Sequence, residues 1–283
     1  MPALARAADA EGISVEVLAA RVLDGTVVLL ANSARRDHIR AVAVGSGLSV
    51  KVNANIGASG TASGALREIA KFDAALRAGA DAVMDLTTSG DVEAIRRTVL
   101  NRSTIPVGTV PVYEAAVRAV SERGAVTRMT ADDLIAAARR QAAEGVDFQT
   151  IHAGFTRAQA EAVARSDRLT GVVSRGGALL ACYMAASGEE NPYYERFDEV
   201  LEICREHDVT LSLGDSLRPG CLADAGDDAQ MEELRILGDL VLRAREAGVQ
   251  VIVEGPGHVP LSEVPYHVVE AKRLCHGAPL YLL

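Results

Sequence analysis

The chain lacks tryptophan, and aromatic residues make up only 4% of its 283 residues. It also lacks an excess of positive charge, since 29 Lys and Arg side chains face 38 Asp and Glu side chains and leave a net charge of −9. An acidic surface repels the phosphate groups of nucleic acids and of anionic lipids. The composition therefore argues against nucleic acid or an anionic membrane as the main partner.

Cysteine is scarce and apolar runs are short. The four cysteines, at positions 182, 204, 221 and 275, form no C-x-x-C pair, so we expect neither a disulfide framework nor a zinc ribbon. No apolar run approaches the ~18 residues of a transmembrane helix, and no charged and then apolar signal opens the sequence. We therefore expect a soluble, cytoplasmic protein that does not bind membranes.

Short β-branched segments alternate with helical patterns from residue 49 onward. Strands that alternate with helices form parallel sheets, and eight of them within about 250 residues are typical of a (β/α)₈ barrel. We therefore expect an α/β fold, with a (β/α)₈ TIM-type barrel over residues 49–283 and a short N-terminal extension, residues 1–48. The expected strands span residues 49–55, 82–87, 106–113, 148–152, 171–174, 210–214, 249–253 and 279–283.

The two ends of the sequence carry further expectations. Ser14 is expected to cap a helix from Val15 to Leu23, before an extended run at residues 26–30. The following charged segment is expected to be solvated; it contains Arg35, Arg36, His38 and Arg40. The chain ends in the expected eighth strand, and a closing strand without a covering helix would leave an apolar flank open to water. We therefore expect the barrel to be incomplete at its C-terminus.

Polar side chains follow the expected strands one after another. In a barrel the carboxyl ends of all strands share one rim, where barrel enzymes place their catalytic groups. The pattern therefore predicts a polar pocket at this rim. The residues at these ends are Asn53, Asn55, Asp85, Thr87, Thr88, Tyr113, His152, Ser174, Arg175, Asp215, Arg218, Glu254 and His258.

Several of these stretches have both a structural and a ligand-binding interpretation. Ser174 and Arg175 precede a helix with two glycines, so backbone N–H groups and a guanidinium could hold a phosphate there. Asp215 and Arg218 either pair with each other or bind a ribose hydroxyl and a phosphate. Asn55 either closes a turn or binds a heterocycle or sugar, because its amide both donates and accepts.

Four other side chains leave similar choices. Met84 by default packs in the core, and Tyr113 either donates a phenolic hydrogen bond or covers the barrel top. His152 ends a strand and could bind substrate. His258 follows Gly-Pro-Gly beside a carboxylate and is the best metal-ligand candidate, although a catalytic zinc site usually has three protein ligands.

Seven multi-residue motifs follow one another along the chain. They are KVNANIG (51–57), VMDL (83–86), GTVPVY (108–113), TIHAG (150–154), VSRGG (173–177), LGDSLRPG (213–220) and EGPGHVP (254–260). Together they closely resemble the phosphomethylpyrimidine synthase (ThiC) family of thiamine biosynthesis. The resemblance implies a (β/α)₈ barrel that converts 5-aminoimidazole ribotide into 4-amino-5-hydroxymethyl-2-methylpyrimidine phosphate. It also implies a radical reaction in which a 4Fe-4S cluster cleaves S-adenosylmethionine.

The resemblance further implies roles for individual residues. Glu254 and His152 would be catalytic, and His258 would be one of two histidines that hold zinc or iron. A homodimer is implied, in which the cluster-bearing tail of one protomer reaches the other's barrel. The implied substrate contacts are Asn55, Met84, Tyr113, His152, Ser174, Arg175, Gly176, Asp215, Ser216, Leu217, Arg218, Glu254 and Tyr281.

The sequence departs from the family pattern in two respects. The second metal histidine and the C-x-x-C-x-x-x-x-C cluster motif would lie beyond Leu283, and neither is present. Because the cofactor carries the radical chemistry, we expect this chain to bind the ribotide weakly and not to turn it over alone. Ser216 stands where the family pattern has glycine, and its hydroxymethyl group would either crowd a ligand or add a hydrogen bond.

Other functions remain open from the sequence. A related enzyme makes 5-hydroxybenzimidazole, a precursor of the cobamide lower ligand, from the same ribotide, and the motifs do not separate the two. A second alternative is a non-catalytic, truncated barrel that binds a ribotide. A third is an ordinary metal-dependent lyase that needs only His258 and carboxylates such as Glu254 and Asp215.

Overall fold

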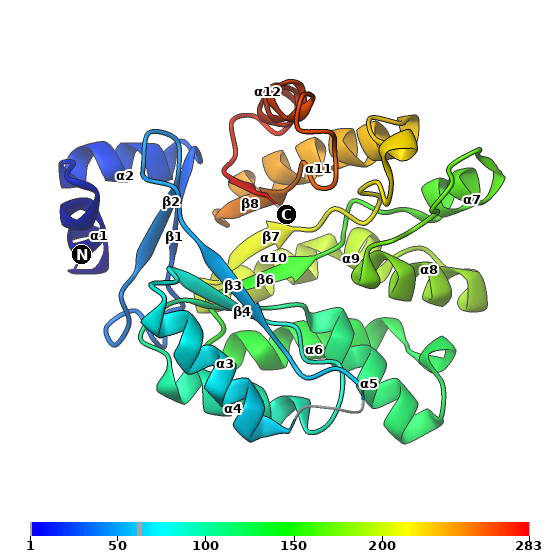
Figure 1. Ribbon diagram of the computed structural model, residues 1–283, viewed down its shortest axis with the longest axis horizontal. Helices are drawn as coiled ribbons and strands as arrows, with labels where there is room; N and C mark the ends of the chain where they lie inside the picture. Colours follow the sequence, from blue (N-terminus) through cyan, green and yellow to red (C-terminus); the bar gives the residue numbers. More distant parts are fainter. Residues whose placement is uncertain (1, 61–63, 283) are drawn as a thin grey trace.

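A parallel sheet forms the centre of the molecule. The computed structural model describes residues 2–60 and 64–282. The sheet has seven strands in the order β3-β4-β5-β6-β7-β8-β9, so each strand pairs with the next one along the chain. The sheet curls into part of a barrel (Figure 1). Its strands are β3 (Asn53–Ile56), β4 (Ala82–Asp85), β5 (Val107–Thr109), β6 (Phe148–Ile151), β7 (Thr210–Leu213), β8 (Val251–Glu254) and β9 (Leu280–Tyr281).

Helices follow the strands and lie outside the curled sheet (Figure 1). Every residue of β4, β6, β7 and β8 is buried, as expected for parallel strands covered on both faces. The elements are α3 (Ala65–Arg77), α4 (Val92–Arg102), α5 (Pro111–Arg123), η1 (Val126–Arg128), α6 (Ala131–Ala143), α7 (Arg157–Arg165), α8 (Arg175–Ser187), α9 (Pro192–Glu195), α10 (Phe197–His207), η2 (Leu222–Asp224), α11 (Asp228–Glu246) and α12 (Val264–Leu274).

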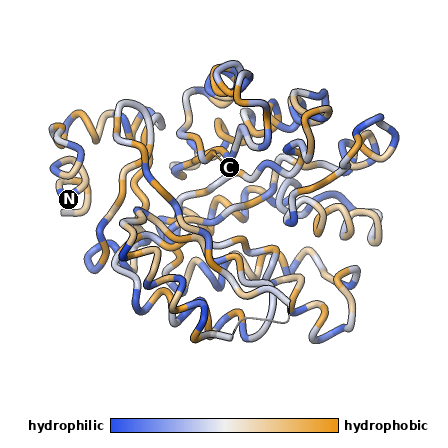
Figure 2. The backbone as a smooth tube through the Cα atoms, viewed as in Figure 1, coloured by the Kyte–Doolittle hydropathy of each residue, from blue (hydrophilic) through white to orange (hydrophobic). Residues whose placement is uncertain are grey.

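The distribution of hydrophobic residues matches this arrangement of a central sheet covered by helices. Hydrophobic residues gather on the strands and on the helix faces that cover them (Figure 2). Helix α11 illustrates the cause, because Leu237, Leu240, Val241 and Ala244 recur at three- and four-residue spacing and are all buried. Among the described residues, no helix combines the length and hydrophobicity that crossing a bilayer requires.

The N-terminal residues form two helices and a hairpin beside the sheet. They are α1 (Pro2–Glu11), α2 (Val15–Leu23) and the antiparallel strands β1 (Val27–Leu30) and β2 (Val42–Gly45). The expected cap is confirmed, because the Ser14 side chain accepts a hydrogen bond from the N–H of Val17. The Gln250 side chain bonds both backbone groups of Leu29, which ties the hairpin to the residue just before β8.

Arg35 corrects the expectation of a solvated segment. Its guanidinium pairs with the Asp147 carboxylate, and the Arg35 and Asp147 side chains are 11% and 0% exposed. The same carboxylate accepts the N–H groups of Asn32 (2.9 Å) and Val107 (2.8 Å). A buried ion pair therefore joins the N-terminal segment to the residue just before β6, whose carboxylate also binds the start of β5, whereas the neighbouring Arg36 remains exposed.

The expected strand at residues 171–174 is wrong, and an eight-stranded closed barrel is not confirmed. Residues 171–174 form no strand, because β6 pairs directly with β7 along four residues and leaves no place between them. Their two valines instead lead into α8, which Ser174 caps. The last expected strand is observed as β9, while Leu283 lies outside the described residues.

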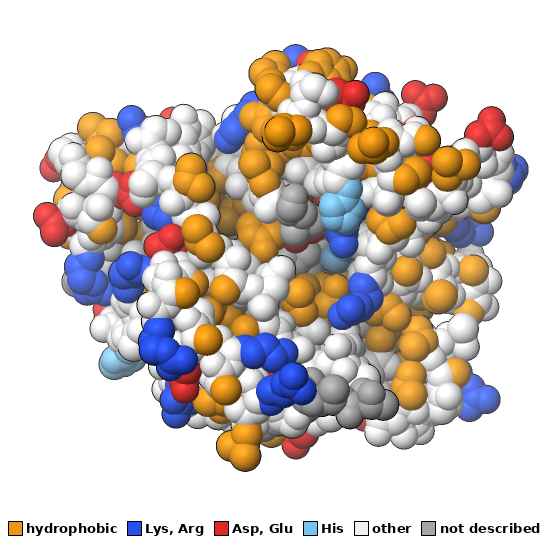
Figure 3. All heavy atoms as spheres, in the orientation of Figure 1, with side chains coloured by type: hydrophobic (Ala, Val, Ile, Leu, Met, Phe, Trp, Pro, Cys, Tyr) orange, Lys and Arg blue, Asp and Glu red, His pale blue; other side chains and the backbone are white. Residues whose placement is uncertain are grey.

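Side chains bridge the two outer strands of the sheet. The Asn53 amide donates to the Tyr281 hydroxyl at 2.8 Å, and this hydroxyl lies 3.4 Å from the Asn55 side-chain oxygen. Strands β3 and β9 are thus close, although no backbone pairing joins them in the described residues. A cavity of about 540 Å³ lies between the hairpin and this seam, and Figure 3 shows hydrophobic side chains in a hollow on this face.

Candidate functional site

The candidate residues lie at the carboxyl ends of the strands, which share one end of the curled sheet. This end is called the mouth. Asn55 is paired in register with Met84, and Glu254 with Tyr281. Paired residues of neighbouring strands point to the same face of a sheet. The seam hydrogen bond between Tyr281 and Asn55 then brings the first and last strands to this same mouth.

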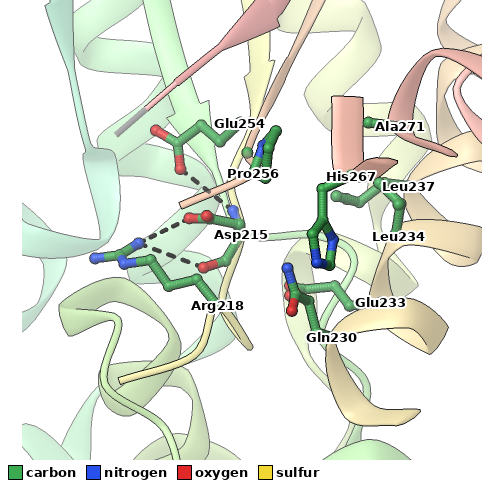
Figure 4. Close-up of a pocket in the computed structure, with 11 residues that line it drawn as sticks. Asp215, Arg218, Gln230, Glu233, Leu234, Leu237, Glu254, Pro256, His267 and Ala271 are labelled. Carbon is green, nitrogen blue, oxygen red and sulfur yellow. Dashed lines mark hydrogen bonds and ion pairs between the residues drawn. The ribbon is translucent and has the colours of Figure 1, made fainter. Parts of the chain in front are cut away.

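Glu254, Asp215 and Arg218 form the centre of the site (Figure 4). The N–H of Asp215 donates to Glu254 Oε2 at 3.2 Å, and Arg218 Nη1 lies 2.8 Å from Asp215 Oδ1. Both carboxylates are buried, with 6% and 7% exposure, whereas the Arg218 side chain is 19% exposed. The expected pairing of Asp215 with Arg218 is therefore observed, and the guanidinium keeps access to the mouth.

Burial changes the ionisation of these carboxyls. It raises the pKa of Glu254 well above the usual range, and the nearby Asp215 raises it further. Burial also raises the pKa of Asp215, although the Arg218 guanidinium opposes this shift. Two carboxyl groups close together disfavour double ionisation. Glu254 therefore holds a proton at a higher pH than an exposed glutamate does and can act as an acid or a base.

His152 and Ser174 form a second part of the site. His152 Nε2 lies 3.1 Å from Ser174 Oγ, which also accepts the N–H of Gly177 at 3.3 Å. A Cβ on Gly176 would lie 2.3 Å from the imidazole, so glycine is required where α8 meets His152. Burial, assisted by the positive charge of Arg218, lowers the pKa of His152 to about 3. The imidazole is therefore neutral near neutral pH, which suits hydrogen bonding more than proton donation.

The neutral state of His152 gives a first testable prediction. Its imidazole resonances are expected to stay unchanged between pH 8 and pH 5, because the folded protein resists charging this ring. ¹H–¹⁵N NMR of the imidazole nitrogens measures this directly, and free imidazole in the same sample provides the reference. A His152→Gln variant identifies the resonance. A titration of His152 near pH 6.5, the usual value for histidine, would contradict the prediction.

Other expected contacts surround this centre. The Arg175 guanidinium lies over the Tyr113 ring, 5.5 Å from its centroid, within the range of a cation–π contact. Burial raises the pKa of Tyr113; the negative charge of Glu254 raises this pKa further, and the positive charge of Arg218 lowers it. Met84 is 3% exposed and belongs to the core, which agrees with its default interpretation. Asp85 turns back to bond the N–H and hydroxyl of Thr87, so this carboxylate is satisfied within its own turn.

The sequence reasoning missed two buried polar side chains behind this centre, Glu233 and His267. They line a cavity of about 30 Å³, room for about one ordered water. Glu233 of α11 is 2% exposed, and His267 of α12 is 3% exposed. The signal was a glutamate on the apolar face of α11, four residues before Leu237. The polar residues lining the cavity are Asp215, Arg218, Gln230, Glu233, Glu254 and His267.

His258 supplies one possible metal ligand. Its Nδ1 donates to the carbonyl oxygen of Pro219 at 3.0 Å, and the residue is exposed. This bond leaves the lone pair on Nε2, as in metal-bound histidines whose other nitrogen is held by a carbonyl. Among the described residues, however, no group of three or more His, Cys, Asp or Glu side chains could hold a metal ion. The described part of the chain therefore contains no set of three such ligands that would complete a metal site at His258.

Comparison with known sequences identifies the family. The sequence model of the Radical SAM ThiC family matches residues 1–283. The chain belongs to this family. Phosphomethylpyrimidine synthases from Dehalococcoides mccartyi (strain CBDB1) and Desulforudis audaxviator (strain MP104C) are 50% and 51% identical to it over 282 residues. Both alignments cover 100% of this chain, which spans 65% of the length of either relative.

Two further matches complete the comparison. A phosphomethylpyrimidine synthase from Methanopyrus kandleri is 51% identical over 276 residues, which are 98% of this chain and 64% of that protein. A solved dihydropteroate synthase from Xanthomonas albilineans superposes with a TM-score of 0.47 and 13% identity. That alignment covers 90% of this chain and 78% of the solved one. The family assignment rests on the sequence matches.

A radical SAM family implies S-adenosylmethionine and an iron–sulfur cluster. All four cysteines of this chain are free, and they lie on separate elements: Cys182 on α8, Cys204 on α10, Cys221 before η2 and Cys275 after α12. Such a cluster is held by cysteine thiolates gathered around it. The described residues of this ThiC-family chain therefore do not fit a cluster site, and they form a curled parallel sheet whose strand ends carry polar side chains.

Proposed function

We propose that the mouth of this curled sheet binds 5-aminoimidazole ribotide, and that the whole protein converts it into the pyrimidine phosphate precursor of thiamine. The membership of the ThiC family and the name of its relatives, phosphomethylpyrimidine synthase, support this proposal. The observation that carries it is the buried cluster of Glu254, Asp215 and Arg218 at the mouth. It combines a cation for a phosphate with a carboxyl that retains a proton.

The phosphate of the ribotide would lie between Arg218 and the start of α8. Ser174 caps this helix, and Arg175 and Gly176 begin it, so free N–H groups and the positive end of the helix dipole face the site. The Arg218 guanidinium donates to an anion with a charge-assisted hydrogen bond. The start of α8 would therefore have two roles, since it would bind the phosphate and it packs against His152 through Gly176.

The heterocycle would lie nearer the seam. Asn55 and Tyr281 meet there, and together they offer an amide and a phenol to ring nitrogens and ribose hydroxyls. Neutral His152 contributes a hydrogen bond without adding charge. Met84 would form the floor of the pocket, and Tyr113 with Arg175 its outer wall.

Glu254 would move a proton during the reaction. Its Oε1 lies 3.4 Å from the Thr150 hydroxyl, and its Oε2 accepts the N–H of Asp215, which fixes the carboxyl at the end of β8. Because burial raises its pKa, Glu254 is a stronger base than an exposed glutamate and can accept a proton from, or return one to, a ring nitrogen.

Calorimetric titration of this 283-residue chain tests the binding step. We expect 5-aminoimidazole ribotide to bind and the corresponding riboside, which lacks the phosphate, to bind at least about tenfold more weakly, because a charge-assisted contact is lost. Ribose 5-phosphate serves as the control for the heterocycle. Equal affinity for ribotide and riboside would contradict the proposed phosphate site, and no binding of the ribotide would contradict the substrate.

A further inference from the structure

Glu233 holds the loop that carries two of the candidate residues. Its carboxylate oxygens accept the N–H groups of Ser216 at 2.8 Å and of Leu217 at 2.6 Å. The glutamate comes from α11 and is 2% exposed, so solvent does not compete for these bonds. One buried carboxylate therefore fixes two successive amides of the segment 215–218.

The third amide of this segment also faces a carboxylate, since the N–H of Asp215 donates to Glu254 Oε2 at 3.2 Å. Two protein carboxylates therefore accept these three N–H groups, Glu254 from β8 and Glu233 from α11. The backbone of the segment is therefore held inward, and the Arg218 guanidinium remains to face a ligand.

Residues 215–218 pack directly against the start of α8, so the position of one depends on the position of the other. Ser216 is fully buried, and a Cβ on Gly177 would lie 2.8 Å from the Ser216 Cβ. Gly177 belongs to the first turn of α8, which Ser174 caps beside His152. A shift of Ser216 would therefore move both sides of the proposed phosphate site.

We propose that Glu233 is a positioning residue of the site, whose carboxylate fixes residues 215–218 and thereby directs Arg218 toward the phosphate of the ligand. The identity of that ligand rests on the proposed function. The restraint on the loop rests on the two hydrogen bonds alone.

The charges around Glu233 make this restraint sensitive to pH. The titratable groups that line the same cavity are Asp215 and Arg218 of the loop, Glu254 of β8 and His267 of α12 (Figure 4). Burial, together with the Asp215 carboxylate, raises the pKa of Glu233 to about 7. A protonated carboxyl has only one good acceptor oxygen. One of the two loop bonds is therefore weakened as the pH falls below about 7.

Backbone NMR of the wild-type chain tests the restraint without any ligand. The amide proton shifts of Ser216 and Leu217 are expected to follow one titration with a midpoint near pH 7. Glu233→Gln, which keeps the shape but has one acceptor, should show no such step. Glu232→Gln is the matched control, because its side chain is 53% exposed on the same helix and pairs with Arg235. Amides that do not titrate in the wild type would overturn the inference.

Ribotide affinity supplies the second measurement. At pH 8 Glu233→Gln should bind the ribotide about tenfold more weakly than the wild type, the effect of one charge-assisted bond. The ratio of wild-type to variant affinity should be smaller at pH 6 than at pH 8, because the phosphate of the ribotide titrates alike with both proteins whereas only the wild type has Glu233. Equal affinities in both proteins would overturn the positioning role. Absence of wild-type binding would reject the proposed ligand, and the amide titration would still decide the loop restraint.

Discussion

Replacing Asp147 by Asn is expected to lower the free energy of unfolding by about 3–5 kcal/mol, the usual cost of removing one partner of a buried ion pair. Asp147 accepts the N–H groups of Asn32 and Val107 and pairs with Arg35. An amide has the same shape but only one acceptor, and its NH₂ group would face these donors. Arg35 would then keep only the carbonyl oxygens of Leu100, Ser103 and Gly145.

Urea unfolding of the wild type and of two matched variants measures this effect. Asp208→Asn is the control, because Asp208 pairs with the neighbouring Arg36 at 3.1 Å while both side chains are about half exposed, 50% and 45%. An exposed pair of this kind contributes less than about 1 kcal/mol. Asn also tolerates the positive φ of 54° at this position. Equal losses in the two variants would show that the Asp147 pair does not anchor the N-terminal segment.

Replacing Arg218 by Ala is expected to weaken binding of the ribotide by about ten- to hundredfold, or about 1.5–3 kcal/mol. Arg218 is the cation that pairs with Asp215 at the mouth, and its charge lowers the pKa of both Asp215 and Glu254. Its removal therefore takes away a phosphate contact and also favours the protonated carboxyls. The Asp215 carboxylate, if it stays ionised, would repel the phosphate as well.

Calorimetry with the ribotide and with its riboside separates these contributions. The loss should be large for the ribotide and small for the riboside, because only the ribotide presents a phosphate to Arg218. Arg235→Ala, an exposed arginine of α11 that pairs with Glu232, provides the control and should bind as the wild type does. A variant at Arg218 that binds both ligands equally well would remove this residue from the proposed phosphate site.

Much of the local structure followed from short stretches of sequence. The cap at Ser14 and the helix Val15–Leu23 were predicted to the residue, since an N-cap and the turn after it depend on neighbours within one turn. Seven of the eight expected strands exist, because β-branched runs between helical patterns indicate buried strands wherever they occur. The fifth expected strand, residues 171–174, was wrong, because its two valines suit an extended lead into a helix as well as a strand.

Partners at a distance explain what the sequence did not reveal at the site. The order of strand ends placed Asp215 and Glu254 on one rim, but the bond between them depends on the register of β7 against β8. Glu233 looked like an ordinary helix residue until the packing of α11 brought it to the N–H groups of Ser216 and Leu217. Its burial depends on packing between elements, which no local pattern specifies.

The sequence by itself determined the parallel α/β architecture, the family and the residues that end each strand, because hydrophobic period, capping and motif spacing are local properties. Only the tertiary structure decided that Arg35 is buried against Asp147 and that Tyr281 contacts Asn55 across the seam. It also decided that carboxylates accept hydrogen bonds from the N–H groups of residues 215–217. These contacts join residues far apart in the chain. Their formation depends on strand register and on which side chains lose water together, and both are set by the folded chain as a whole.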